Sequence, residues 1–116
     1  MQKIEGSILI VEDNPVLAME LEMIFEDVGL EIVGPAATVR HALELLENTN
    51  PSYATVDFNL GHETGETITE RLRTKDVPFV CITGEPEVAA HRCQLEPNQV
   101  LSKPFMTQDI LQALIH

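Results

Sequence analysis

The chain has 116 residues, enough for one domain built around a single hydrophobic core. Its 19 acidic residues outnumber 7 basic ones, and the formal net charge of −12 excludes direct nucleic-acid binding as a main role, because phosphate backbones require clustered lysines and arginines. No apolar stretch approaches the roughly 18 residues that cross a membrane, and no signal-peptide pattern opens the chain, so we expect a cytoplasmic protein without membrane or nucleic-acid partners.

Short apolar runs recur along the chain and predict β-strands. They cover residues 7–11, 31–35, 53–57, 79–82 and 99–101. Their nearly continuous apolar character is typical of parallel strands that are buried on both faces of a sheet.

Helices are predicted between these runs. Asn14 precedes Pro15 as an N-cap, and the helical apolar stripe that follows ends at Gly29, a plausible C-terminal stop. The other predicted helices are a stripe at 39–46, a short helix with Ile68 and Leu72, a brief helix that starts at Pro86, and a last helix with Thr107 as its N-cap.

The alternation of five strands with five helices predicts an α/β protein. We expect a doubly wound parallel sheet that is covered by helices on both faces. Residues 1–116 are expected to form one domain that ends inside its last helix, without an output domain, and residues 58–65 are expected to form a long loop.

Reactive side chains close four of the five predicted strands. Glu12 and Asp13 follow the first strand, Asp57 ends the third, Thr83 follows the fourth and Lys103 follows the fifth. Because the carboxyl ends of parallel strands share one edge of a sheet, we expect these side chains to converge in one pocket.

Three carboxylates in one pocket repel each other by on the order of a few kcal/mol unless a cation offsets their charge. Asn14 already caps the first helix, so Glu12 and Asp13 are not needed as caps. Oxygen ligands without a cysteine or histidine cluster favour Mg²⁺ over zinc. A purely structural acid cluster that pairs with Lys103 is the alternative interpretation.

Mg²⁺ beside a carboxylate, with an ammonium and a hydroxyl opposite, suits phosphoryl transfer. The carboxylate of Asp57 could attack a phosphorus atom and become an acyl phosphate. Mg²⁺ and Lys103 would neutralise charge on the phosphoryl oxygens in the transition state, and Thr83 could donate a hydrogen bond to one of them.

These residues in this order resemble the receiver domains of two-component response regulators, and the plan is similar to that of single-domain chemotaxis regulators. The resemblance covers essentially the whole chain and rests on Glu12-Asp13, Asp57, Thr83-Gly84 and Lys103-Pro104. It implies a flavodoxin-like, three-layer α/β/α fold with strand order 2-1-3-4-5.

The resemblance also implies a role for each residue of the pocket. Asp57 would be the phosphoacceptor, Lys103 would pair with the phosphoryl group, and Thr83 would be a switch hydroxyl that moves toward it. The Mg²⁺ ligands would be Glu12, Asp13, Asp57 and the backbone carbonyl of Asn59.

Partners follow from the same resemblance. The phosphodonor would be a phosphohistidine on a bacterial histidine kinase or histidine phosphotransfer protein. Phosphorylation would change binding to an unidentified downstream protein, or would convert a monomer into a dimer. No enzymatic activity is expected beyond the chain's own phosphorylation and dephosphorylation. The docking rim for the donor would comprise Asn14, Pro15, Leu17, Ala18 and Pro104-Phe105.

The chain departs from the commonest receiver pattern at two positions. Gly61 replaces a proline in the loop after the phosphoacceptor, and Val100 occupies the position where many receivers carry a switch tyrosine or phenylalanine. The stretch 78–84 partly matches stand-alone bacterial receivers that read Pro-Phe-x-Phe-Ala-Thr-Gly and often lack this aromatic. Signalling would then run through movement of residues 83–93.

Two other functions are compatible with parts of the pattern. A Mg²⁺-dependent phosphohydrolase with an aspartyl nucleophile would typically need a second acid two residues later, where this chain has Asn59. A flavodoxin-like nucleotide-binding domain would need a glycine, serine or threonine phosphate cradle where this chain has Glu12-Asp13.

Overall fold

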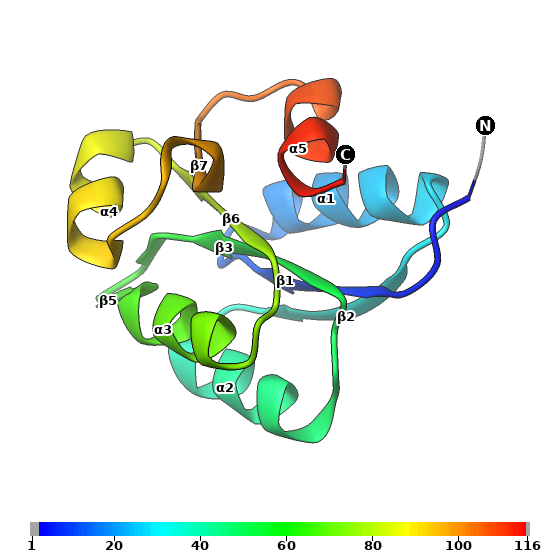
Figure 1. Ribbon diagram of the computed structural model, residues 1–116, viewed down its shortest axis with the longest axis horizontal. Helices are drawn as coiled ribbons and strands as arrows, with labels where there is room; N and C mark the ends of the chain where they lie inside the picture. Colours follow the sequence, from blue (N-terminus) through cyan, green and yellow to red (C-terminus); the bar gives the residue numbers. More distant parts are fainter. Residues whose placement is uncertain (1–2, 116) are drawn as a thin grey trace.

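The apolar runs form a five-stranded parallel sheet in the computed structural model, which describes residues 3–115 (Figure 1). The strand order is β2-β1-β3-β6-β7, which confirms the predicted order 2-1-3-4-5 of the five main strands. The strands of this sheet are β1 (Ser7–Val11), β2 (Glu31–Ala36), β3 (Tyr53–Asp57), β6 (Phe79–Thr83) and β7 (Val100–Ser102).

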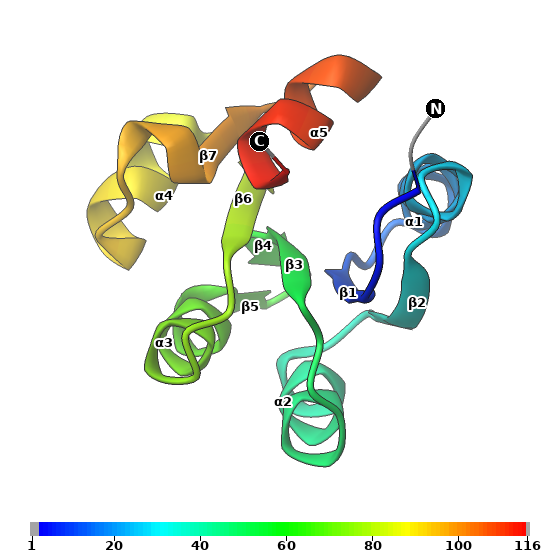
Figure 2. The same cartoon turned by 45° about the vertical axis from the view of Figure 1, so that its right-hand side comes forward.

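Helices cover both faces of the sheet, as predicted. Figure 2 shows α2 and α3 on one side of the strands, with α1 and α5 on the other. The helices are α1 (Pro15–Asp27), α2 (Val39–Asn48), α3 (Glu66–Thr74), α4 (Pro86–Cys93) and α5 (Thr107–Leu114), with a 3₁₀ turn η1 (Pro97–Gln99) before β7.

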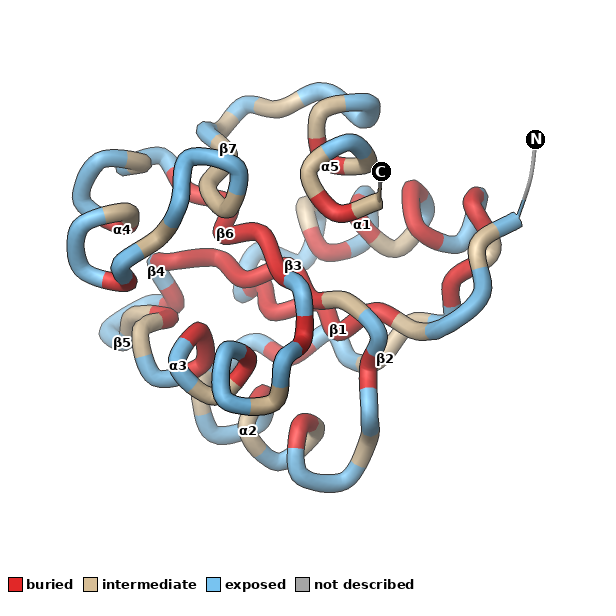
Figure 3. Tube along the Cα trace, viewed as in Figure 1, coloured by how far each residue is buried: buried red, intermediate tan, exposed pale blue. Residues whose placement is uncertain are grey.

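Two large apolar clusters fill the space between the sheet and these helices. One joins alternate residues of β1 and β6 to α1 and α5, including Ile8, Phe25 and Ile110. The other joins the opposite sheet face to α2 and α3, including Leu46 and Leu72. Buried residues therefore follow the central strands and the inner sides of the helices (Figure 3).

Local signals fixed the ends of α1 as expected. The Oδ1 atom of Asn14 accepts hydrogen bonds from the backbone nitrogens of Val16 at 2.9 Å and Leu17 at 3.2 Å. Gly29 follows the helix with a φ of 99°, a left-handed conformation that glycine adopts without a steric penalty. The chain can therefore turn directly into β2.

The segment 58–65 is not the irregular loop that we expected. It contains a small antiparallel ribbon of β4 (Asn59–Leu60) and β5 (Glu63–Thr64). The turn between them holds Gly61 at a φ of 67°, which permits a tight hairpin connection. Strands this short carry no alternating pattern, so sequence periodicity could not reveal them.

The start of α5 also differs from the expectation. Thr107 is the first helical residue rather than the N-cap, which is Met106. The side chain of Asp109 accepts a hydrogen bond from the Met106 backbone nitrogen at 3.2 Å, so an acid in the first turn satisfies this end. No helix among residues 3–115 is long and apolar enough to cross a membrane.

Candidate functional site

The carboxyl ends of β1, β3 and β7 bring two acids and a lysine together. Asp57 ends β3 and is only 4% exposed, and Glu12 follows β1 and is only 3% exposed. The Nζ atom of Lys103, just after β7, lies 3.0 Å from Asp57 Oδ2 and 3.7 Å from Glu12 Oε1. The structure therefore brings these three side chains into one pocket at the sheet edge.

Each buried carboxylate has a partner for both of its oxygens. The Asn59 backbone nitrogen donates to Asp57 Oδ1 at 3.1 Å, opposite the oxygen that faces Lys103. The Asn14 backbone nitrogen donates to Glu12 Oε2 at 3.1 Å. The backbone directly after β1 and β3 thus orients the two acids, which limits the rotamers that they can adopt.

Negative charge nevertheless remains in excess at this edge. Burial, and then the nearby Asp57 side chain, raise the pKa of Glu12 from 4.5 to about 7, although the Asn14 backbone and Lys103 act in the opposite direction. At neutral pH a cation that approaches this carboxyl readily displaces its proton, which passes to water.

The acids have the chemistry and the spacing of a divalent-cation site. One carboxylate oxygen from each of Glu12, Asp13 and Asp57 lies within 4.8 Å of the other two. Asp13 is exposed, so the cluster is open to solvent on one side. An all-oxygen, partly hydrated ligand set of this kind fits Mg²⁺.

Thr83 ends β6, the strand next to β3 in the sheet. It is fully buried and pairs in register with Ser102, one residue before Lys103. Its Oγ1 atom accepts a hydrogen bond from the Glu85 backbone nitrogen at 2.9 Å. The hydroxyl is thus engaged with the β6–α4 loop rather than with Asp57.

A weak bridge connects this loop to the segment after Asp57. The Nδ2 atom of Asn59 lies 3.5 Å from Glu85 Oε2, at the long limit for a hydrogen bond. The residues two positions after Asp57 and after Thr83 therefore face each other across the mouth of the pocket.

Gly65 supports the site, although we did not assign it a role from the sequence. A Cβ atom on Gly65 would lie 2.9 Å from Val56 Cγ1 and 3.0 Å from the Asp57 carbonyl oxygen. Only a residue without a side chain permits α3 to begin so close to β3. The sequence signal that could have identified Gly65 is its position directly before a predicted helix.

The predicted docking rim is largely accessible. Asn14, Pro15 and Pro104 are exposed, and Leu17 and Phe105 are half-buried.

Ala18 is an exception, because it is only 3% exposed and packs inward from α1. The apolar residues that α1 does present to solvent are Val16, Met19 and Met23, which are 74%, 58% and 63% exposed. Their positions lie opposite the buried stripe of the helix, which was the signal that could have identified them.

A doubly wound sheet with strand order 2-1-3-4-5 and an acidic pocket beside a lysine at its carboxyl edge defines a receiver-type protein. The family model described as "Response regulator receiver domain" matches residues 8–115. The chain belongs to this family and is a receiver domain of the two-component response regulators. This membership favours signalling over the phosphohydrolase and nucleotide-binding alternatives.

Individual relatives agree with the family assignment. The chain is 32% identical over 106 residues to the phyllosphere-induced regulator PhyR of Methylorubrum extorquens, covering 89% of this chain and 40% of that protein. The solution structure of the PhyR receiver domain from Erythrobacter litoralis is 32% identical, with a TM-score of 0.83, and the match covers 95% of this chain and 90% of that one.

A further relative bears on the metal. The receiver domain of the sensor histidine kinase PA1611 from Pseudomonas aeruginosa is 25% identical, with a TM-score of 0.81 and coverage of 96% of this chain and 95% of that one. That structure contains a magnesium ion coordinated in its active-site cleft.

Proposed function

We propose that Asp57 accepts a phosphoryl group from a protein phosphohistidine in a bacterial two-component pathway. The observation that carries this proposal is the buried Asp57 carboxylate, with the Lys103 ammonium 3.0 Å away and two more acids beside it. In the reaction an oxygen of Asp57 forms a bond to phosphorus as the bond from phosphorus to the donor imidazole breaks.

Each residue of the pocket contributes one task to this transfer. Glu12, Asp13, Asp57 and the Asn59 backbone carbonyl would hold Mg²⁺, which neutralises charge on phosphoryl oxygens when it is bound. Lys103, whose ammonium lies 3.0 Å from Asp57, pairs with a phosphoryl oxygen. The Thr83 hydroxyl leaves the Glu85 backbone nitrogen and donates to the phosphoryl group.

The α1 surface supplies a docking site for the donor protein. A hollow of about 350 Å³ beside Lys103 is lined by Leu17, Glu20, Pro104 and Phe105. The exposed side chains of Met19 and Met23 extend this apolar surface along α1. A donor helix bound here would bring its phosphohistidine close to Asp57.

The output is a change in protein binding rather than catalysis of an external reaction. We propose that phosphorylation alters affinity for a downstream protein or for a second copy of the chain, and that the process takes place in the bacterial cytoplasm. The bacterial signalling regulators among the relatives support this assignment.

Labelling with acetyl phosphate and Mg²⁺ tests the proposal. The wild-type chain and Asp76→Asn, a change at an exposed and distant acid, should take up one phosphoryl group per chain. Asp57→Asn should take up none, because an amide oxygen is a poor nucleophile. Equal labelling of Asp57→Asn and the wild-type chain would refute the assignment.

A further inference from the structure

Both ends of α4 contact the short segment that follows Asp57. At the start of α4, Glu85 faces the Asn59 side chain at 3.5 Å. Toward its end, Ala89 and Cys93 pack with Phe58 and with Cys81 of β6 in a small apolar cluster. The position of α4 is therefore defined by residues directly adjacent to the proposed phosphoacceptor.

Arg92 adds a polar attachment at the end of α4. Its guanidinium lies 5.6 Å from the centroid of the Phe58 ring, within range for a cation–π contact. The same guanidinium forms an ion pair with Glu66, the first residue of α3. Arg92 thus connects α4 at once to the residue after Asp57 and to the neighbouring helix.

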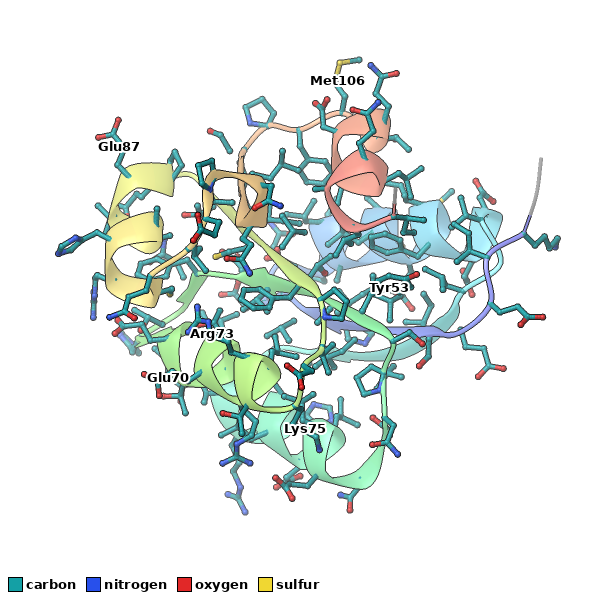
Figure 4. All side chains as sticks on the ribbon, viewed as in Figure 1. Tyr53, Glu70, Arg73, Lys75, Glu87 and Met106 are labelled. Atoms are coloured by element: carbon teal, nitrogen blue, oxygen red, sulfur yellow. The ribbon has the colours of Figure 1, made fainter. Side chains whose placement is uncertain are left out.

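Arg73 of α3 reinforces the same end of the helix. Its Nη2 atom donates to the Cys93 carbonyl oxygen at 2.6 Å, and Figure 4 shows Arg73 between α3 and the end of α4. Thr83 and Glu85 form the attachments at the other end, and the Glu85 bridge to Asn59 is long. Arg73 and Arg92 therefore hold the C-terminal end of α4 more firmly than its N-terminal end is held.

Val100 offers no aromatic ring on the other side of α4. It is half-buried on β7, in register with Cys81, whereas the ring that contacts α4 is that of Phe58. The aromatic ring that packs against α4 therefore comes from the residue after β3, and β7 supplies none.

Phosphorylation should disturb these attachments. A phosphoryl group on Asp57 carries roughly 1.5 to 2 negative charges in place of the single carboxylate charge, and it repels the nearby Glu85 carboxylate. Thr83 shares a sheet face with Cys81, on the α4 side, because side chains alternate along a strand. For Thr83 to reach the phosphoryl group, residues 83–85 must move, and α4 begins at the next residue.

We propose that Arg92 is an autoinhibitory strap, which holds α4 in its resting position through Phe58 and Glu66 and is released when Asp57 is occupied. This inference rests on the proposed phosphorylation of Asp57. Contacts that exist only in the resting arrangement oppose occupancy of Asp57 by the amount that they stabilise that arrangement. Removing the strap should therefore strengthen binding at Asp57, although the contacts of Arg92 are with Phe58 and Glu66.

The test measures the affinity for beryllium fluoride, a phosphoryl mimic that binds aspartate carboxylates together with Mg²⁺. In Arg92→Met the hydrocarbon stem remains over Phe58, while the charge is lost. We expect calorimetric titration to show beryllium fluoride binding about fivefold tighter than in the wild-type chain, as the loss of one cation–π contact and one partly shielded ion pair implies. Amide resonances of residues 83–93 should shift toward their bound positions before ligand is added.

Arg40→Met is the matched control, because it removes an arginine–glutamate ion pair from the exposed surface of α2. Its affinity should equal that of the wild-type chain. Glu66→Gln removes the ion pair from the α3 side and should also tighten binding, which keeps the test valid if Arg92→Met folds poorly.

Three results would overturn the strap. Unchanged affinity in both Arg92→Met and Glu66→Gln would mean that the contact persists in both arrangements. Weaker affinity would mean that Arg92 stabilises the occupied arrangement. Failure of the wild-type chain to bind beryllium fluoride would overturn the proposed function as well, whereas normal wild-type binding with an inert Arg92 would overturn the strap alone.

Discussion

Around Glu12 and Lys103, negative charge exceeds positive charge in a largely buried part of the site. Two acids that are almost excluded from solvent share one ammonium group, and a third acid lies at the surface beside them. Burying unpaired charge costs free energy, so the metal-free site is expected to be less stable than the rest of the sheet edge.

The raised pKa of Glu12 makes the stability of the metal-free protein depend on pH. Between its ordinary value of 4.5 and its folded value of about 7, the folded state holds a proton that the unfolded state has lost. The free energy of unfolding should therefore fall as pH rises through this window and level off above it. Glu12→Gln should remove this slope and add about 1 to 3 kcal/mol of stability at pH 8.

Urea unfolding in the presence of a chelator, at several pH values, provides the measurement for Glu12. The difference between the wild-type chain and Glu12→Gln isolates this residue from other titrating groups. Parallel stability curves for the two proteins across pH 4.5 to 8 would show that the Glu12 pKa is not raised.

Replacing Lys103 with methionine should leave Asp57 and Glu12 without their cation. We expect Lys103→Met to lose roughly 1 to 3 kcal/mol of stability without metal, because a buried charge loses its hydrogen-bonded partner. Millimolar Mg²⁺ should restore part of the loss, since a divalent cation supplies the missing positive charge.

Lys75→Met is the matched control for Lys103. Lys75 donates to the Leu46 carbonyl oxygen at 2.6 Å, on α2 and far from the acids. In thermal unfolding, the stability that Lys75→Met loses should not be restored by Mg²⁺. Equal rescue of both variants by Mg²⁺ would exclude a local electrostatic effect at Lys103.

The elements around the pocket divide into those that the sequence specifies and those that only packing specifies. The five main strands and the caps of α1 follow from local patterns, and the structure confirms them within one or two residues. The ribbon of β4 and β5 does not follow, because two-residue strands carry no period. Only the two-residue turn at Gly61-His62 hinted at it.

The convergence of the site residues was predictable from the order of strands along the chain. Glu12, Asp57 and Lys103 converge because strand ends in a parallel sheet share an edge, which is a rule of topology. The contact of Arg92 with Phe58 joins residues far apart in sequence and depends on how α4 packs, so no local pattern could predict it. The Thr83 hydroxyl, in contrast, is oriented locally, because it accepts a hydrogen bond from the backbone nitrogen two residues later.

Gly65 is the element-scale feature with the sharpest consequence. A methyl group there would overlap Val56 and the Asp57 carbonyl, so Gly65→Ala should lose roughly 1 to 3 kcal/mol through overpacking. It should also lower the rate of labelling by acetyl phosphate, because Asp57 must shift.

Gly84→Ala serves as the control for Gly65. A Cβ atom on Gly84 meets nothing within 4 Å, so the free energy of unfolding should change little. Urea unfolding of both variants measures this difference in the free energy of unfolding. Equal stability of Gly65→Ala and the wild-type chain would mean that α3 can retreat from β3 without cost.

At the scale of the whole molecule, the charge is distributed unevenly. Within residues 3–115, the arginines form ion pairs with acids of α2 and α3, and Lys103 pairs with Asp57. No ion pair among these residues involves an acid of α1, although Glu20 and Asp27 line a hollow of about 310 Å³ with Met23 between α1 and α5. This surface therefore suits a partner that is apolar at its centre and basic at its edges.

Substitution of the exposed α1 methionines separates docking from chemistry. The double variant Met19→Gln/Met23→Gln should accept phosphoryl groups from acetyl phosphate at the wild-type rate, because acetyl phosphate does not dock. Transfer from the cognate phosphohistidine protein, identified by profiling against the kinases of the source cell, should slow about tenfold, which corresponds to ~1.4 kcal/mol of lost affinity.

Val88→Gln is the matched control for the methionine variant, because Val88 is an exposed apolar residue on α4 instead of α1. Its transfer rate from the protein donor should be unchanged. Wild-type transfer to the double methionine variant would remove α1 from the docking site.

The central claim is that one buried aspartate captures phosphorus. The most direct measurement treats the chain with acetyl phosphate and Mg²⁺, reduces the acyl phosphate with borohydride, and locates the resulting homoserine by peptide mass spectrometry. We predict homoserine at position 57 alone, and none when Mg²⁺ is chelated. Homoserine at Asp13, the corresponding five-carbon alcohol (5-hydroxynorvaline) at Glu12, or an unmodified Asp57 in fully phosphorylated protein, would contradict the account.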